Sequence, residues 1–353
     1  MSPFSALLKS TFIERFYYKQ VKNMGEQICT PETSSAPKIL KKIPKKTFKQ
    51  RLQQDIRKNW VVYVIFAPVL LYFIIFHYIP MFGIIMSFQD FSVRKGVFGS
   101  EWVGFENFIR LFTVDDFGRI LKNTTMMSLF NLTIGFICPI IFAILLSTVR
   151  PRFFKRTIQI ASYMPYFIAT VVVVAMWTEF LAANGPITNT LTWMFGLPDQ
   201  NWLQNTEEPV FWVINGVIEI WTGCGYGAIV YCAAIANVNP NQHEAAAIDG
   251  AGKWKRLWNV TIPAILPLIV TMLTLRVGLV FTQGFEKVLL LQNPATQSTT
   301  SDCLMTYINR VAFAGSADYG LAAAGGLFQS VIASILLVIS NWLNRKVAKS
   351  SLF

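Results

Sequence analysis

The sequence predicts an all-α integral membrane protein with six transmembrane helices. Of its 353 residues, 53% are apolar and 14% are charged, whereas charged residues make up about 25% of an average soluble domain. Six apolar runs each reach the roughly 20 residues needed to cross the hydrocarbon core of a bilayer. Lys and Arg gather in the segments on one side of these runs, as they do in cytoplasmic loops.

The first 58 residues predict a basic cytoplasmic tail ahead of a six-span membrane domain at 59–353. The tail holds 13 of the 31 Lys and Arg residues and is interrupted by Pro31, Pro37 and Pro44, which argues for a mobile segment. Its lysines fit two interpretations. They bind anionic lipid, or they act only as a signal that keeps this end in the cytoplasm.

The six spans are predicted from the lengths of the apolar runs. Their ranges are 60–88, 124–149, 159–181, 211–236, 264–285 and 322–343. If the spans alternate in direction, both termini are cytoplasmic, because the predicted cytoplasmic segments then contain 23 of the 31 basic residues and the external segments contain 7. The remaining one, Arg276, lies within the fifth span. An external loop at 91–122 carries the amphipathic string WVGFENFIRLF.

A polar stretch at 239–263 separates the fourth and fifth spans and is predicted to be a cytoplasmic docking element. Asn239 can cap a short helix, and Gly250 and Gly252 permit a sharp reversal after it. A second short helix is expected at 253–259, with tryptophans on one side and basic residues on the other, a pattern typical of the membrane interface. The alanines of the first helix allow close approach to a groove on another protein.

The string EAAAIDGAGKWKRLWNVTIPAILP resembles the EAA loop of the permease subunits of binding-protein-dependent ABC importers. The similarity is closest to the carbohydrate branch that carries fragments of polysaccharides. It implies the type I ABC importer permease fold and a coupling helix that fits a cleft on a cytosolic ATPase. The residues that match the motif and are expected to couple to the ATPase are Glu244, Ala245, Ala246, Asp249, Gly250 and Ala251. His243 stands where the family usually has Tyr.

The resemblance also implies partners and a location. The expected complex contains a second, homologous permease, an ATPase dimer, an extracytoplasmic solute-binding protein and an oligosaccharide substrate, and it lies in the bacterial cell inner membrane. The substrates of this branch include acidic oligosaccharides such as alginate and pectin fragments. The sequence has no Gly-x-x-x-x-Gly-Lys-Ser/Thr string, so we expect no cofactor in this chain, with ATP and Mg bound by the partner ATPase.

Polar residues inside the spans are candidates for the substrate path, because ionisable groups in a membrane usually face a cavity or a partner. Glu219 and Arg276 lie midway along their spans, and they either pair with each other or face the substrate. If Arg276 faces an acidic substrate, its guanidinium can donate two parallel N–H bonds to a uronate carboxylate. The candidates are Asn215, Glu219, Trp221, Arg276 and Gln283. Hydrogen bonding to a neighbouring helix is the alternative for each. The string GCGYG at 223–227 indicates either a flexible break or close helix packing.

Two rival functions are a membrane-embedded enzyme and a secondary transporter. The five cysteines show no CxxC spacing and there are two histidines, so neither a metal site nor a disulfide framework is indicated. An enzyme would need His, Asp or Cys residues clustered at one depth, and a secondary transporter would be expected to show repeated halves with several intramembrane carboxylates. The sequence shows neither pattern clearly.

Overall fold

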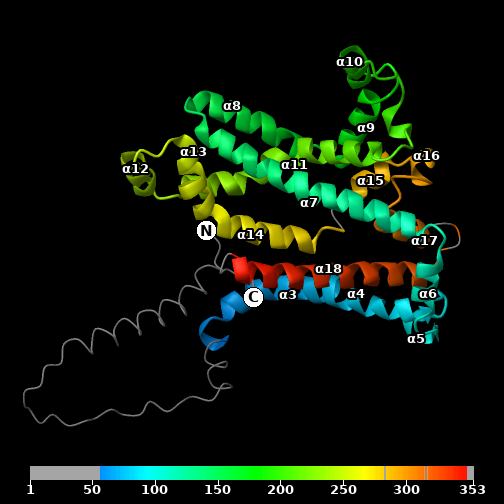
Figure 1. Ribbon diagram of the computed structural model, residues 1–353. Helices are drawn as coiled ribbons and strands as arrows, with labels where there is room; N and C mark the ends of the chain where they lie inside the picture. The colour runs from blue at the N-terminus through cyan, green and yellow to red at the C-terminus, as the bar shows by residue number, and fades with distance from the viewer. Residues whose placement is uncertain (1–55, 282–283, 314, 316, 348–353) are drawn as a thin grey trace, which may run out of the picture. The chain divides into compact units, whose positions relative to one another are not determined.

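The computed structural model describes residues 56–281, 284–313, 315 and 317–347, and these residues are mostly helical (Figure 1). The chain divides into two units, Met1–Leu70 and Leu71–Phe353. The described part of the first unit, 56–70, contains the start of α3. The basic tail predicted at 1–58 lies almost entirely outside the described residues.

The elements follow one another in an order that is helical except for one short hairpin. They are α3 (Trp60–Phe73), η1 (Ile74–Tyr78), α4 (Ile79–Met81), η2 (Phe82–Phe88), β1 (Gln89–Asp90), α5 (Gly96–Gly99), β2 (Glu101–Trp102), α6 (Glu106–Thr113), α7 (Phe117–Thr148), α8 (Arg152–Tyr163), η3 (Met164–Phe167), α9 (Thr170–Phe180), α10 (Pro186–Phe195), η4 (Trp202–Gln204), α11 (Val210–Ala236), α12 (Pro240–Ile248), α13 (Lys253–Arg256), η5 (Leu257–Thr261), α14 (Ile262–Gly278), α15 (Phe285–Leu291), α16 (Pro294–Gln297), α17 (Leu304–Phe313) and α18 (Tyr319–Val347). The strands β1 and β2 pair antiparallel.

Five helical segments of the described chain are long and apolar enough to cross a membrane. They are Trp60–Phe88, Phe117–Thr148, Val210–Ala236, Lys253–Gly278 and Tyr319–Lys346. A sixth crossing exists only if the bent pair Arg152–Phe167 and Thr170–Phe180 is counted as one span. The structure therefore agrees with the six predicted spans in number on that condition.

The third predicted span, 159–181, falls on two helical segments. These segments, Arg152–Phe167 and Thr170–Phe180, meet at an angle of 101°. The backbone is extended at Ile168 and Ala169, with ψ of 133° and 138°, so the hydrogen-bonded ladder stops there and restarts in α9. The string MPYFIAT contains a single Pro and no Gly at this point, and nothing in its apolar pattern marks the break.

The second short helix predicted at 253–259 is not a separate element. It runs without a break from α13 through η5 into α14, as one helical segment, Lys253–Gly278. A proline ring clashes with the carbonyl four residues earlier in an α-helix. Here the turn just before Pro263 is a π-helix, in which the Ile262 N–H donates to the Leu257 carbonyl five residues back. The wider turn makes room for the proline.

The first span also has a π-helical turn just before a proline. Its π-helical stretch η1 lies just before Pro80, and the Ile79 N–H donates to the Ile74 carbonyl. In both spans the five π-helical residues are followed by Ile and then Pro. Pro80 is thus accommodated by local widening of the helix.

The fifth span ends earlier than predicted. Helix α14 stops at Gly278, and Phe285, predicted as the last residue of this span, begins the separate helix α15. Gly284, immediately before α15, has φ of +76°, a left-handed conformation that favours glycine. The chain therefore leaves the span and starts a new helix within a few residues.

Helices α7 and α11 pack along their lengths and form the centre of the larger unit (Figure 1). Small residues allow the close approach: Ala143 and Ala228 are fully buried. A side-chain carbon added at Gly225 of α11 would collide with the backbone carbonyl of Ser162 in α8. Helix α11 is continuous through 223–227, so of the two readings of GCGYG the structure supports close packing, at Gly225, and excludes a break.

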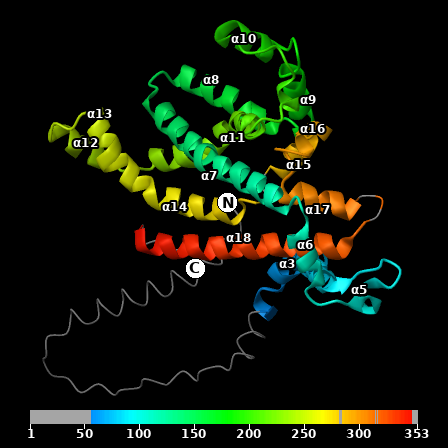
Figure 2. The same cartoon turned by 45° about the vertical axis from the view of Figure 1, so that its right-hand side comes forward.

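A second group of helices forms around α18. In both views α14 runs beside α18 (Figures 1 and 2), and η2, α6 and α17 also contact α18. Polar side chains tie these elements: Asn344 of α18 donates to the Thr274 hydroxyl and to the Val270 carbonyl of α14. The Asn107 side chain of α6 donates to the carbonyls of Ser87 and Gln89. The predicted amphipathic helix in WVGFENFIRLF is α6.

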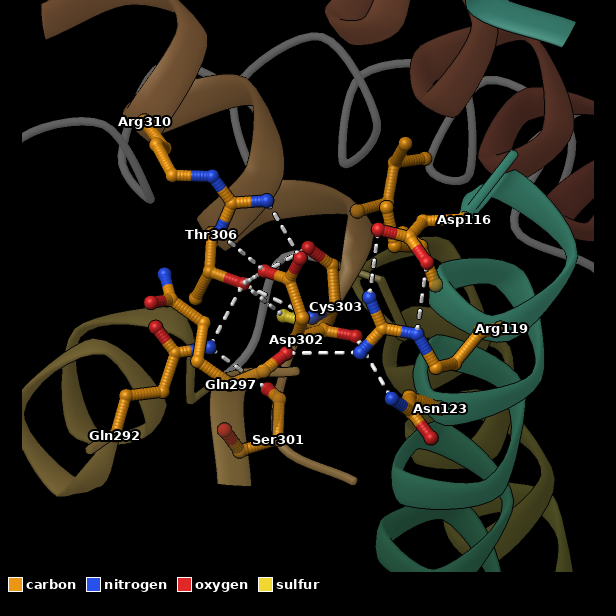
Figure 3. Close-up of polar contacts among 12 residues, drawn as sticks. Asp116, Arg119, Asn123, Gln292, Gln297, Ser301, Asp302, Cys303, Thr306 and Arg310 are labelled. Atoms are coloured by element: carbon orange, nitrogen blue, oxygen red, sulfur yellow. Dashed lines mark hydrogen bonds and ion pairs between the residues drawn. The ribbon is translucent and has the colours of Figure 1, made fainter. Parts of the chain in front are cut away.

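A buried polar network fastens the start of α7 to the loop before α17 (Figure 3). Asp302 is 1% exposed and receives two hydrogen bonds from Arg310, at 3.0 and 2.6 Å. Arg119 and Asn123 of α7 donate to backbone carbonyls of the same loop. The bonds to Asp302 raise the pKa of the Arg310 guanidinium, and burial raises the pKa of the Cys303 thiol, so Arg310 stays charged and Cys303 stays neutral near pH 7.

The packing of α11 on α8 gives a stability prediction. Gly225→Ala should destabilise the protein by roughly 1–3 kcal/mol, because the new methyl group meets backbone, which cannot rotate away. The measurement is the melting temperature of the purified protein in detergent.

Gly223→Ala is the matched control, since an added carbon there meets no atom within 4 Å. Alanine also favours a helix over glycine, so this variant should melt at or above the wild-type temperature. Equal melting temperatures for the two variants would mean that α8 does not pack closely on α11.

Candidate functional site

The docking element predicted at 239–263 has the local geometry that its residues indicate. The Asn239 side chain accepts a hydrogen bond from the Asn241 N–H and caps α12, and Pro240 occupies the first turn. At the other end the Ala251 N–H donates to the Ala246 carbonyl and the Gly250 N–H donates to that of Ala247. These two bonds form a Schellman motif, which satisfies carbonyls at the end of the helix.

Gly250 supplies the left-handed residue of this motif, with φ of +73°. A side chain at this position would be strained, so glycine has a defined role here. Gly252 has an extended backbone with φ of −64°, so only Gly250 of the two predicted turn glycines requires glycine. The turn fixes α12 relative to the start of the long helical segment that includes α14.

The surface of the docking element is open. Glu244 is exposed, and Ile248 is 87% exposed at the end of α12. On α13 and η5, Trp254 and Trp258 are 74% and 61% exposed, next to the basic residues of KWKR. The matched residues Ala245, Asp249 and Ala251 lie at the surface or partly so. The element therefore exposes an acidic and apolar helix beside an aromatic and basic segment.

A second polar centre lies within the helices. The ammonium group of Lys287, on α15, donates to Glu219 Oε2 of α11 at 2.7 Å and to the Asn215 carbonyl at 3.1 Å. The Lys287 side chain is 8% exposed and that of Glu219 is 27% exposed. The ion pair thus joins α15 to the middle of α11, with the carboxylate on the more open side.

This ion pair borders a cavity of about 380 Å³. The volume is within the range of small-molecule sites, about 300–1,000 Å³. Besides the ion pair, the lining includes Tyr166, Thr222 and Glu286. Tyr166 is held by stacking on Tyr226, with ring centroids 3.8 Å apart and planes at 4°. The cavity combines an aromatic ring, hydroxyl groups and charged groups.

The other predicted path residues are distributed around this centre. Asn215 is buried, and it borders a smaller neighbouring cavity with Glu219 and Lys287. Trp221 is 38% exposed, contacts Trp177 edge to face and lines neither cavity. Gln283 lies outside the described residues.

The possible pairing of Glu219 with Arg276 is not found. Arg276 donates to Asn131 Oδ1 of α7 at 3.2 Å and borders a different, small pocket. In the described part of the chain the ion-pair partner of Glu219 is Lys287. Sequence reasoning missed Lys287 because it counted this residue among external loop charges, although the string FEKVLLL places a single cation in an apolar run.

Comparison with known proteins identifies the family. The model of the family described as the binding-protein-dependent transport system inner membrane component matches residues 132–349. The polygalacturonan/rhamnogalacturonan transport system permease protein YteP of Bacillus subtilis (strain 168) is 36% identical over 323 residues, which cover 91% of this chain and 98% of YteP. The chain belongs to this family of transport permeases.

Solved structures agree with this assignment. The permease resembles a chain in the crystal structure of a bacterial ABC transporter involved in the import of the acidic polysaccharide alginate, with 34% identity, a TM-score of 0.77 and coverage of 84% of this chain and 99% of that one. A second structure holds a bacterial alginate ABC transporter in complex with an alginate pentasaccharide-bound periplasmic protein; it gives 34% identity, a TM-score of 0.78 and coverage of 86% and 100%.

These findings confirm the predicted family and the type I ABC importer permease fold. The protein is the permease of a sugar or polysaccharide ABC importer, and so a transport subunit rather than an enzyme.

The pairing found here can be tested by double-mutant cycles. Glu219→Gln and Lys287→Met should show a coupling free energy of roughly 1–3 kcal/mol in unfolding, because each single change leaves a largely buried charge without its partner. The cycle of Glu219→Gln with Arg276→Met should give less than about 0.5 kcal/mol. A larger coupling to Arg276 than to Lys287 would contradict the assigned ion pair.

Proposed function

We propose that this permease forms, together with a second, homologous permease, the translocation path of an ATP-driven importer for an oligosaccharide delivered by an extracytoplasmic solute-binding protein. The observation that carries the proposal is the exposed, capped helix α12, fixed by the Gly250 turn to the long helix Lys253–Gly278. A helix in that position suits a groove on a partner ATPase.

ATP and Mg belong to the partner ATPase dimer in this proposal. The sequence lacks a phosphate-binding Gly-x-x-x-x-Gly-Lys-Ser/Thr string, so this chain contributes no nucleotide site of that kind. Its part is mechanical: movement of the ATPase subunits displaces Glu244 and the rest of α12, and α14 carries the displacement into the membrane.

The proposed location is the bacterial inner membrane, with α12 and both termini in the cytoplasm. Basic residues of three segments far apart in the sequence support this orientation: 150–156, 253–256 and 345–346. Each lies at or beside the end of a candidate span. Cytoplasmic ends of spans carry such an excess of Lys and Arg.

The substrate path is proposed to include the cavity beside Glu219 and Lys287. The names of the relatives point to polysaccharide fragments, among them acidic ones such as alginate and polygalacturonan. Asn215, Trp221, Arg276 and Gln283 remain proposed path residues, as predicted from their positions in the spans. The guanidinium of Arg276 is the proposed contact of an acidic substrate.

The coupling role of α12 gives the main functional prediction. Glu244→Lys should abolish most ATP-driven uptake, by about tenfold or more, since it places a cation where the exposed carboxylate meets its partner. The measurement is uptake of radiolabelled oligosaccharide by proteoliposomes that contain the whole complex, with membrane insertion followed by the yield of folded protein.

Glu207→Lys is the matched control, because Glu207 is also an exposed glutamate but lies in the segment before α11, far along the chain from α12. This variant should transport at the wild-type rate. Unchanged uptake in the Glu244→Lys complex would remove the docking role from α12.

A further inference from the structure

The charges around the 380 Å³ cavity set a preference for the charge of the sugar that enters it. Two acidic side chains, Glu219 and Glu286, and one basic side chain, Lys287, line the cavity. Lys287 already donates to Glu219 at 2.7 Å and is the more buried of the two. The cavity is therefore bordered by two carboxylates and one ammonium group whose charge Glu219 already balances.

We propose that this wall binds an uncharged sugar unit of the oligosaccharide and disfavours a uronate there. The inference rests on the proposed function and names the substrate class at the same site. A carboxylate accepts hydrogen bonds and cannot donate them, so Glu219 and Glu286 match the hydroxyl donors of a neutral sugar. The carboxylate of a uronate would meet two like charges in a partly enclosed space.

Lys287 does not bind a substrate carboxylate, because Glu219 already occupies its ammonium group. Its ammonium group donates both to Glu219 and to the Asn215 carbonyl, and its side chain is 8% exposed. A uronate would have to displace Glu219 and leave that carboxylate near the cavity without its partner, which is costly for a buried pair. Lys287 thus acts as a positioning residue that keeps the Glu219 carboxylate oriented.

The remaining groups also fit a neutral sugar. Tyr166, stacked on Tyr226, offers an aromatic surface to the C–H face of a pyranose ring. The Thr222 hydroxyl donates to backbone carbonyls of its own helix, which leaves its oxygen able to accept from a sugar hydroxyl. In the neighbouring cavity, Asn215 is 9% exposed, and its Oδ1 accepts no hydrogen bond from any described residue.

Arg276 is the competing group, because a guanidinium favours a carboxylate. It is a member of a different pocket, with Asn131, Leu132 and Val280, and its N–H donates to Asn131. That pocket has no room for a water molecule, so Arg276 offers no competing carboxylate site at the cavity, and the sugar unit beside Glu219 is neutral. This arrangement favours oligosaccharides that contain an uncharged sugar over uniform polyuronates.

The test uses a matched pair of probes: trigalacturonate and the neutral trisaccharide made from it by reducing its carboxyl groups. Saturation-transfer NMR against the purified complex of permeases and ATPase, without the binding protein, gives the Kd of each probe. The wild-type complex should bind the neutral probe at least about tenfold more tightly. The double variant Glu219→Gln/Glu286→Gln should shift this ratio toward the acidic probe by about tenfold or more.

Glu286→Gln alone keeps the test decisive if the change at Glu219 impairs folding, since the Lys287 pair stays intact; it should shift the ratio in the same direction. Glu207→Gln, at an exposed glutamate outside the cavity lining, should leave the ratio unchanged. Equal or tighter binding of trigalacturonate by the wild type, no shift in the Glu286→Gln complex, or binding of neither probe would overturn the proposal. ATP-driven oligosaccharide uptake judges the proposed function separately, and it can persist in each of these cases.

Discussion

Within hydrocarbon, each peptide N–H and C=O has to find its partner inside the protein, and this constraint determines how the permease is built. It explains why prolines in two of its spans do not break the helix. The π-helical turns before Pro80 and Pro263 keep the ladder closed, through bonds from Ile79 and Ile262 to carbonyls five residues back. Lys253–Gly278 is consequently one continuous segment. The docking helix α12 is joined to that segment by a turn whose N–H groups donate to carbonyls at the end of α12.

The same low dielectric governs the charged side chains. An ion pair across α11 and α15 makes a carboxylate tolerable in the middle of a span, and the Lys287 hydrogen bond to the Asn215 carbonyl adds a second contact between the two elements. At the other polar centre, Asp302 is nearly inaccessible and is paired with Arg310 (Figure 3). The first pair borders a cavity, whereas the second fastens a loop to α7. The two ion pairs are chemically similar. The Glu219–Lys287 pair has a proposed binding role because it borders a cavity, whereas the Asp302–Arg310 pair has a structural role because it lies in a buried loop.

Local features of the sequence predicted the structure where the cause was local. Asn239 and Gly250 act within a few residues of themselves, so the cap and the turn of α12 could be read directly from the chain. The number of apolar runs and the positions of the basic residues likewise follow from the bilayer alone. The bend at Ile168 and Ala169 was missed because the run there is uniformly apolar and tertiary packing decides where it turns.

The site was harder to predict because its partners are distant in sequence. Glu219 and Lys287 are 68 residues apart, and no periodicity connects them. Arg276 was expected to pair with Glu219 because both lie midway along their predicted spans. In the structure, Arg276 of α14 instead donates to Asn131 of α7. A break was expected at the junction of α13 and α14, where the sequence shows a polar string followed by Pro263. Only the observed i to i−5 hydrogen bond shows that the helix continues.

The central claim is that α12 and α14 move as one body, because the Gly250 turn joins α12 to a helix that is continuous from Lys253 to Gly278. Inserting three glycines between Thr261 and Ile262 of the complete complex tests it most directly, with the same insertion after Pro198, in an exposed loop, as the control. The measurement is ATP hydrolysis and oligosaccharide uptake by the same proteoliposomes. The account predicts that the insertion at Thr261 preserves ATP hydrolysis and abolishes uptake, while the loop insertion preserves both. Uptake at the wild-type rate with the insertion at Thr261 would contradict it.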